Sequence, residues 1–440
     1  TSPAAKLDVV GRIGLNNGNL NVIVGDGAGD GLTTGARNVV VGHNALKSED
    51  EHGFNTAIGF DSLKSLNAGA DAYNTAVGYR TGYLLSTGLY NTIVGGLAGD
   101  ALTTGSRNVA IGYNALSAED TGGRSVAIGY AALKDQNFGT DNYNVAVGYA
   151  AGKDIISAIN NTLIGGLAGD ALTTGSDNVA IGSSALTSQL TGNSNVAIGK
   201  SAMTQGLATD RNVAIGYFAL NSLNYTGDSY NVAVGYNAGL SVTTGTTNTL
   251  IGGLAGDALT TGVGNIAIGY ESLSAETGSN SSVAIGKEAL KNQNIGSGGA
   301  YNVAIGDGAG KEITSALYNT LVGGQAGDAI TTGSQNTAVG TFTLSANQEG
   351  KKNVAIGYGS LNAMNPSSAL DTFNVAIGYH SGLSVTTGVQ NTLIGGLAGD
   401  SLTTANNNIA IGYLALTTET SGGNNVAIGV TALQQSNGGT

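Results

Sequence analysis

A five-residue block, Asn-(Val/Thr/Ile)-x-(Ile/Val)-Gly, recurs 24 times between residues 21 and 429 of this 440-residue chain. Successive copies start 17 residues apart in eighteen intervals and 19 to 21 residues apart in the other five. The first position is Asn in 22 copies and Ser in two, and the fifth is always Gly. A short fixed period with invariant small and β-branched positions indicates a solenoid, in which each repeat stacks on the last. Such a chain forms a rod or an extended surface rather than a catalytic pocket.

One repeat, residues 108–124, shows what the pattern predicts locally. Val109, Ala110 and Ile111 form a run of period two, which predicts a short strand with Val109 and Ile111 on the face opposite Ala110. We expect Ile111 and its equivalents to be buried inside the coil. Gly112 ends the run, since Gly adopts positive φ without strain. Residues 113–116 predict a second short strand, and a polar loop then returns to the next copy.

These features predict an all-β fold, a parallel β-solenoid of about 24 coils over residues 21–440, preceded by an N-terminal stub at 1–20. The structural positions of the repeat are those of Asn108, Ile111, Gly112, Ala115 and Leu116. The third position is Ala in 17 of the 24 copies, which predicts a flat outer strand face suited to close approach of another copy. We therefore expect a homotrimer.

A longer period of about 70 residues is superimposed on the repeat. The eighth residue after the Asn is Leu or Met in some coils and Gly in others, and six coils carry Ile or Leu at the third position, namely Ile23, Ile93, Leu163, Leu250, Leu321 and Leu393. In five of the six cases the preceding coil follows a longer loop and has an aromatic residue directly before its Asn. Close-packed cores require volume compensation, so we expect these large side chains and the aromatic rings to fill the space left by the glycines.

Composition excludes several classes of protein. Charged residues are only 10% of the chain and hydrophobic residues 41%, which does not fit a disordered chain. The net charge of −12 argues against nucleic acid as a partner. The chain contains no run of about 18 apolar residues, so the sequence does not predict membrane insertion. The chain has no Cys and begins at Thr1, which fits an extracellular or virion protein trimmed or processed from a longer one.

The block Asn-Val-Ala-Ile-Gly followed by a small residue resembles the head repeats of YadA-type trimeric autotransporter adhesins. The longer pattern Asn-(Thr/Val)-Ala-Ile-Gly-Tyr-x-Ala-Leu is closer to the repeats of bacteriophage tail fibres and large bacterial surface proteins. Residues 1–9, TSPAAKLDV, also resemble the segment that introduces such fibre regions. The resemblance covers essentially the whole chain and implies a homotrimer of left-handed β-rolls, intertwined or side by side. The coil of 17 residues departs from the shorter coil of the adhesin heads.

The block GGLAGD resembles the calcium-binding repeat of RTX β-rolls, and the candidate ligands are Asp100, Asp170, Asp257, Asp328 and Asp400. These aspartates recur every four or five coils, about 19–24 Å apart at a strand spacing of about 4.8 Å. Two of them from one chain cannot share a Ca²⁺ ion, whose oxygen ligands lie about 2.3–2.6 Å away. We therefore interpret them as turn residues and predict no metal or other cofactor. A site completed by loops or another subunit is the alternative.

Other candidate chemistry is weak. Gly199-Lys200-Ser201 imitates the end of a phosphate-binding loop, but Ser194 stands where that motif requires Gly. His43, His52 and His380 are scattered without ligand spacing. Without Cys or a convergent acid–base set, we expect no enzymatic activity.

Tyrosine offers the sharpest binding hypothesis. Ten of the 18 Tyr residues directly follow the repeat Gly, and Tyr113, Tyr130 and Tyr149 do so in neighbouring coils. A stacked ladder is one interpretation, and an exposed row that stacks on glycan rings is the other. Recurrent Thr-Thr-Gly triplets are too intermittent for an ice-binding array and indicate loop tips.

The sequence therefore predicts a non-enzymatic structural fibre, a rigid trimeric shaft or head of a phage tail fibre involved in host attachment. Its expected partners are other fibre or baseplate proteins and a host-surface glycan or receptor, and its expected location is the virion surface or the extracellular space. A bacterial surface adhesin or extracellular filament subunit is an alternative in the same class. A carbohydrate-binding module that uses loops or Tyr rows is the alternative from another class.

Overall fold

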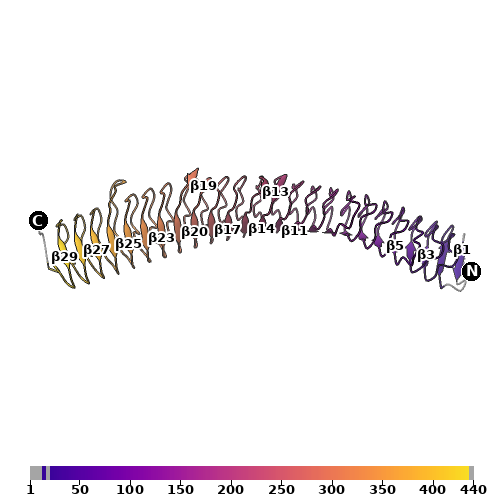
Figure 1. The fold of residues 1–440 in the computed structure, drawn as a ribbon, viewed down its shortest axis with the longest axis horizontal. Coiled ribbons are helices and arrows are strands. Elements are labelled where there is room, and N and C mark those ends of the chain that lie inside the picture. Colours follow the sequence, from indigo (N-terminus) through magenta and orange to yellow (C-terminus); the bar gives the residue numbers. More distant parts are fainter. Residues whose placement is uncertain (1–11, 16–19, 436–440) are drawn as a thin grey trace, which may run out of the picture. The chain divides into compact units, whose positions relative to one another are not determined.

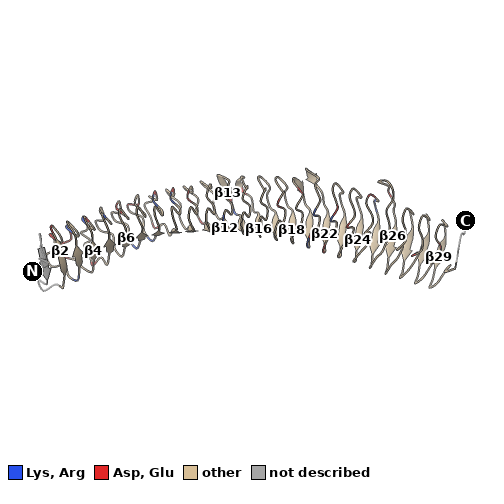
Figure 2. Ribbon diagram, turned by 180° about the vertical axis from the view of Figure 1, so that it is seen from behind, with Lys and Arg blue, Asp and Glu red and all other residues tan. Residues whose placement is uncertain are grey.

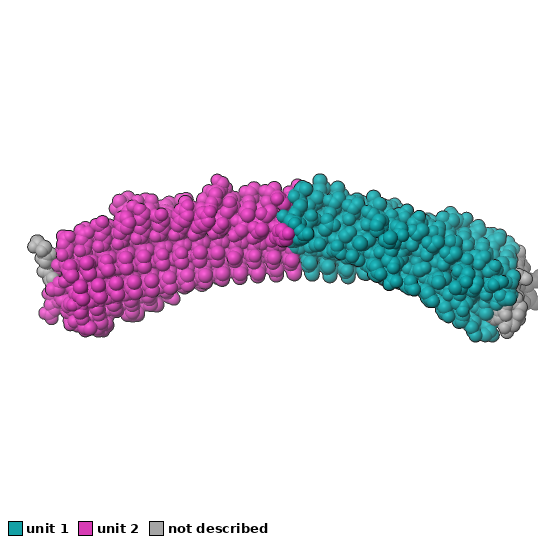
Figure 3. Space-filling view, viewed as in Figure 1, with its two compact units in different colours: residues 1–212, 226–228 teal, residues 213–225, 229–440 magenta. Residues whose placement is uncertain are grey.

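The structure is a computed structural model that describes residues 12–15 and 20–435. The fibre-like segment at residues 1–9 lies outside these described residues. The chain divides into two compact units, one comprising residues 1–212 and 226–228 and the other residues 213–225 and 229–440 (Figure 3). Within the described part of the chain the only regular elements are β-strands. None of its elements is a helix of the length and apolarity that crossing a bilayer requires.

Each repeat contributes one strand, and nearly all of these strands are three residues long. In the first unit they are β2 (Val22–Gly25), β3 (Val39–Val41), β4 (Thr56–Ile58), β5 (Thr75–Val77), β6 (Thr92–Val94), β7 (Val109–Ile111), β8 (Val126–Ile128), β9 (Val145–Val147), β10 (Thr162–Ile164), β11 (Val179–Ile181) and β12 (Val196–Ile198). In the second unit they are β14 (Val213–Ile215), β16 (Val232–Val234), β17 (Thr249–Ile251), β18 (Ile266–Ile268), β20 (Val283–Ile285), β22 (Val303–Ile305), β23 (Thr320–Val322), β24 (Thr337–Val339), β25 (Val354–Ile356), β26 (Val375–Ile377), β27 (Thr392–Ile394), β28 (Ile409–Ile411) and β29 (Val426–Ile428).

Neighbouring repeat strands within each unit pair in parallel and in register (Figure 1). In β7 and β8, for example, Ala110 lies opposite Ala127, so every repeat position lies next to its own copy in the following coil. The predicted parallel β-solenoid of about 24 coils is therefore confirmed.

Among residues 12–15 and 20–435, five further strands lie outside the repeat row. One of them, β1 (Arg12–Leu15), pairs antiparallel with β2 at the N-terminal edge. The longer loops supply two small parallel pairs, β13 (Ala208–Asp210) with β15 (Thr226–Asp228) and β19 (Ser279–Asn280) with β21 (Gly298–Gly299). The long intervals in the repeat thus form extra strand pairs on the loops and leave the row of repeat strands unbroken within each unit.

The strand faces are the reverse of the prediction. Ala110, at the third position, is fully buried, whereas Val109 and Ile111 on the opposite face are only partly buried. Ile181 and Ile268 are partly buried in the same way. The expectation that the fourth-position Ile is fully buried was wrong, and so was the expectation that Ala forms the outer face. The Asn shares the inner face with Ala, because its amide is needed for hydrogen bonds inside the coil.

A ladder of asparagines explains the first repeat position. The Asn108 side chain is fully buried, and its Oδ1 accepts a hydrogen bond from the backbone N–H of Ser125 in the next coil at 2.9 Å. Its Nδ2 donates to the carbonyl of Gly122 at 3.0 Å, in the loop that closes the same coil. One side chain thus joins its coil to the next coil and to its own loop, and a buried polar group with both partners satisfied is stable.

The invariant Gly is required by its close approach to the next coil. Gly112 has φ +135°, and a Cβ built on it would lie 2.3 Å from the carbonyl oxygen of Gly129. The Gly at this position in almost every other coil faces the next Gly in the same way. Any side chain here would push two coils apart, so the sequence signal has a direct steric cause.

The segment after the Gly is a turn and not the predicted second strand. Asn114 and Leu116 have φ of +56° and +52°, which is incompatible with a strand. Its backbone still joins the coils, since Asn114 N–H donates to Gly96 O and Leu116 N–H donates to Ala132 O. Ala115 and Leu116 are fully buried, so their predicted structural role is retained in a different backbone conformation.

A second core position, eleven residues after the Asn, was missed in the sequence. It holds a fully buried apolar side chain in many coils, including Leu66, Leu85, Leu102, Ile155 and Leu172. In the repeat 108–124 this position is Glu119, which hid the row within an apparently polar loop.

The volume compensation between large and small positions is confirmed for the aliphatic residues. Leu163 is fully buried, and a Cβ on Gly152 or Gly169 would lie 2.7 Å or 2.9 Å from its methyl groups. The aromatic part of that expectation was wrong, since Tyr73 and Tyr143 are 46% and 50% exposed.

Candidate functional site

The predicted Tyr row forms a stacked ladder on the surface. The Tyr113 and Tyr130 rings have centroids 5.8 Å apart, and Tyr130 and Tyr149 have centroids 5.3 Å apart, with interplanar angles of 17° and 8°. The three side chains are 49–60% exposed. Carbon atoms in contact are about 3.5–4.0 Å apart, so a sugar ring inserted between two rings would need about 7 Å. A glycan could therefore contact the outer edges and hydroxyl groups of this row but could not insert between its rings.

A second aromatic row lies directly before the repeat Asn. Phe54, Tyr73 and Tyr90 stack with centroids 4.7 Å and 5.6 Å apart. The guanidinium groups of Arg37 and Arg107 lie over the two end rings, 5.0 Å and 5.7 Å from their centroids. The sequence shows the aromatic residues at this position, but their stacking depends on the in-register coils.

The candidate calcium ligands occupy turns, and within each unit several coils separate one aspartate from the next. Burial raises the pKa of four of them, and this effect outweighs the opposing charges of Arg80, Lys153 and Lys311 near Asp100, Asp170 and Asp328; the fourth is Asp257. Asp328 accepts a hydrogen bond from Ser345, and Asp400 accepts one from Thr417. Among the described residues, none of these aspartates belongs to a set of ligand atoms close enough to share an ion. Their interpretation as turn residues is consistent with this geometry, and calcium independence stays a prediction.

A buried polar network replaces the asparagine ladder where the repeat has Ser in place of Asn. The Gln136 amide donates to Ser125 Oγ and to Glu119 Oε2, both at 3.0 Å, and accepts from Asn144 at 2.8 Å. All of these side chains are fully buried. The same arrangement recurs at Glu276, Gln293, Ser282 and Asn302. The recurring Glu and Gln spaced 17 residues apart are a signal in the sequence that could have indicated this network.

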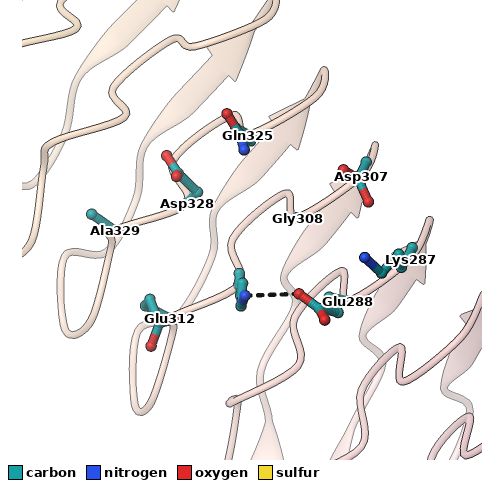
Figure 4. A pocket seen from close by; sticks show the side chains of 9 residues that line it. Lys287, Glu288, Asp307, Gly308, Glu312, Gln325, Asp328 and Ala329 are labelled. Carbon is teal, nitrogen blue, oxygen red and sulfur yellow. Dashed lines mark ion pairs between the residues drawn. The ribbon is translucent and has the colours of Figure 1, made fainter.

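A shallow polar hollow of about 350 Å³ lies in the second unit (Figure 4). Acidic and basic side chains line it, and Lys311 Nζ lies 2.7 Å from Glu288 Oε2. The hydrogen bond from Lys311 lowers the pKa of Glu288. No aromatic ring is among its lining residues, so the hollow offers hydrogen bonds but no platform for stacking. None of the repeat strands carries a charged residue, and Figure 2 shows the charged residues of both units outside these strands.

The three histidines differ in their surroundings. His43 lies 3.4 Å from Asp26 on the surface, and His380 lies against the rings of Tyr358 and Tyr379. His52, in contrast, lies beside Glu49 and Asp50, with potential ligand atoms of all three residues within 4.8 Å of one another. The spacing of the histidines in the sequence gave no sign of this group at His52, because its other members are carboxylates of the same loop.

No known protein-family model matches the chain, and the comparison with curated proteins finds no significant relative. Fold and surface geometry therefore carry the functional argument.

Proposed function

We propose that this chain is a non-enzymatic structural fibre protein and that three copies pack side by side into a rigid shaft or head. The observation that carries the proposal is the outer face of the repeat strands. Its two rows consist of Val, Thr and Ile, carry no charge, and recur in every coil. Single members remain well exposed in the isolated chain, for example Ile164 at 38% and Ile251 at 36%. An apolar strip of this regularity is typical of an interaction surface.

Another copy of this chain is the partner that fits the strip best. The side chains of the strip recur once per coil, so a partner that packs into it over many coils needs the same axial spacing. A second copy has that spacing by construction. A closed arrangement of identical subunits around a rotation axis would bury the strip in every subunit, and a ring of three copies is such an arrangement. The Ala row, from which the sequence predicted a trimer, faces inward, so the proposed contact is made by the outer rows of Val, Thr and Ile.

A fibre of this kind fits the resemblance to phage tail fibres, and the location that we propose for it is the virion surface or the space outside the cell. Partners would be adjoining fibre or baseplate proteins and a host-surface glycan or receptor. A bacterial adhesin or extracellular filament is the related alternative. Electron microscopy of the source particle and mass spectrometry of purified virions separate these origins, and a protein absent from virions would contradict the phage assignment.

The trimer has a direct test, because the chain contains no Cys. We expect Ile181→Cys, on the outer strand face, to form disulfide-linked pairs under mild oxidation, while sedimentation equilibrium of the reduced protein gives the mass of three chains. The control is Ile156→Cys, an exposed Ile on a loop rather than on a repeat strand, which should not cross-link. A monomer at micromolar concentration, or equal cross-linking of both variants, would refute the proposed interface.

Glycan binding is the second candidate function, and the exposed ladder of Tyr113, Tyr130 and Tyr149 favours it. A glycan array with the wild type and a Tyr130→Ala variant tests it. If the wild type binds a glycan and the Tyr130→Ala variant does not, the result supports glycan binding by the Tyr row. Binding that is unchanged in the variant excludes the Tyr row as the glycan site.

A further inference from the structure

Four coils bury a glutamate at the position eleven residues after the repeat Asn, and one of them differs from the rest. The buried glutamates are Glu49, Glu119, Glu276 and Glu419. In the last three, a carboxylate oxygen accepts a short hydrogen bond from the backbone N–H three residues later, at 2.7 Å, 2.9 Å and 2.6 Å. Glu49 makes the corresponding bond, to His52 N–H, at 3.4 Å.

The following coil supplies Glu49 with a backbone donor but with no side-chain donor. Glu119 and Glu276 each accept a hydrogen bond from a Gln side chain in the next coil, at 3.0 Å and 3.1 Å. The residue at that position after Glu49 is the fully buried Leu66, which has no donor. The other bond to Glu49 comes from Ala68 N–H at 3.3 Å.

A histidine replaces a small residue at the same place. Three residues after the buried glutamate, the other coils have Gly122, Ser279 and Gly422, whereas this coil has His52. The Nδ1 atom of His52 is enclosed and has no hydrogen-bond partner. It lies 3.7 Å from Glu49 Oε1. Asp50 completes a group of three potential ligand atoms within 4.8 Å of one another.

We propose that Glu49, Asp50 and His52 form a binding site for a divalent transition-metal ion of the zinc type. Zinc bound by His nitrogen and carboxylate oxygen lies about 2.0–2.2 Å from each ligand atom, so two ligands in a tetrahedral site are about 3.4 Å apart. The 3.7 Å between His52 Nδ1 and Glu49 Oε1 is close to that separation. One nitrogen and two oxygens suit Zn²⁺ better than Ca²⁺, which takes six to eight oxygen ligands.

The ion would supply the compensation that this coil lacks. It would neutralise the buried Glu49 carboxylate and occupy the lone pair of His52 Nδ1, and water would take the open coordination positions. The metal bonds would hold the loop at residues 49–52 against the coil core. At Glu119 and Glu276, hydrogen bonds from Gln amides hold the carboxylate in place instead. Its role would be structural and independent of the proposed fibre function.

Zinc titration of the metal-free, full-length protein tests the site. We expect saturable binding of one Zn²⁺ per chain by calorimetry, together with increased protection from hydrogen exchange at residues 47–55. His52→Gly recreates the residue found beside Glu119 and should therefore fold, and we expect it to weaken Zn²⁺ binding at least about tenfold and to abolish the added protection. His380→Asn removes a histidine that lies far along the chain and should bind Zn²⁺ like the wild type.

The result that would overturn the proposal is either no saturable Zn²⁺ binding by the wild type or binding by His52→Gly that equals the wild type. Displacement of Zn²⁺ by an equal concentration of Ca²⁺ would also overturn it, because the donor set would then behave as an oxygen site.

Discussion

Leu163 provides the strictest test of how this solenoid is packed. Its side chain is fully buried at the third position of its coil, where most coils have Ala. It fills the space at Gly152 and Gly169, where a Cβ would lie 2.7 Å and 2.9 Å from its methyl groups. Replacing Leu163 with Ala leaves two adjacent glycines facing the void, so the coil cannot close it. Buried Leu→Ala changes cost about 2.7–5.0 kcal/mol, and we expect about 4 kcal/mol here.

The cost should be reversible by restoring the ordinary coil pattern. Gly152 and Gly169 have φ of +58° and +57°, close to the +52° at which Leu116 occurs in another coil. Leu at these two positions is therefore compatible with the backbone. In the wild-type background Gly169→Leu should destabilise by overpacking against Leu163, whereas in Leu163→Ala it should recover stability. We expect a coupling energy of at least about 2 kcal/mol between the two sites.

Hydrogen exchange is the suitable assay, because a long repeat array does not unfold in a two-state transition. Local opening free energies of the coils at residues 144–180 give the cost of each variant. Leu167→Ala is the matched control, since Leu167 is in the same coil but 36% exposed. If Leu163→Ala lowered protection no more than Leu167→Ala, or if Gly169→Leu had the same effect in both backgrounds, the volume-compensation argument would be wrong.

Three further predictions concern the invariant Gly of the repeat, the pH dependence of stability at Glu276, and calcium. Gly112→Ala should lower the opening free energy of its coil, measured by hydrogen exchange, by about 3 kcal/mol or more, because the new Cβ would lie 2.3 Å from Gly129 O. Gly166→Ala is the control: a Cβ there would have nothing within 4 Å, so the opening free energy should change by less than about 0.5 kcal/mol. Burial alone would raise the pKa of Glu276, but hydrogen bonds from Ser279 and neighbouring N–H groups outweigh it and lower the pKa below 4.5. The ionised Glu276 therefore contributes fully to folding stability above pH 4.5, and this contribution is lost as the pH falls through the lowered pKa of the folded state. Glu276→Gln should accordingly be less stable than the wild type at pH 7. The difference in stability, followed by hydrogen exchange or melting, should shrink on acidification. Adding Ca²⁺ to metal-free protein should leave circular dichroism and melting unchanged, and a raised melting temperature would instead indicate calcium sites completed by loops or other subunits.

The sequence by itself determined the architecture, because the repeat carries it in two strong signals. An invariant Gly every coil marks where two backbones approach too closely for a Cβ, as at Gly112 and Gly129. The 17-residue spacing of most copies gives coils of equal length that stack in register, and the few longer intervals add residues in the loops. The volume compensation between Leu163 and its neighbouring glycines could also be predicted from the sequence, because it depends only on side-chain volume at positions that stack.

Only the tertiary structure decided which strand face is inside. A three-residue strand with Val109, Ala110 and Ile111 has two faces, and hydrophobicity alone assigns the larger residues to the core. The interior is instead filled by Leu116 and by the row eleven residues after each Asn, and Asn108 must face inward to bond Gly122. Little room then remains for more than Ala, so the β-branched residues point outward. The partners of Glu49 and His52 were likewise not readable, because they depend on what the next coil and the loop bring beside them.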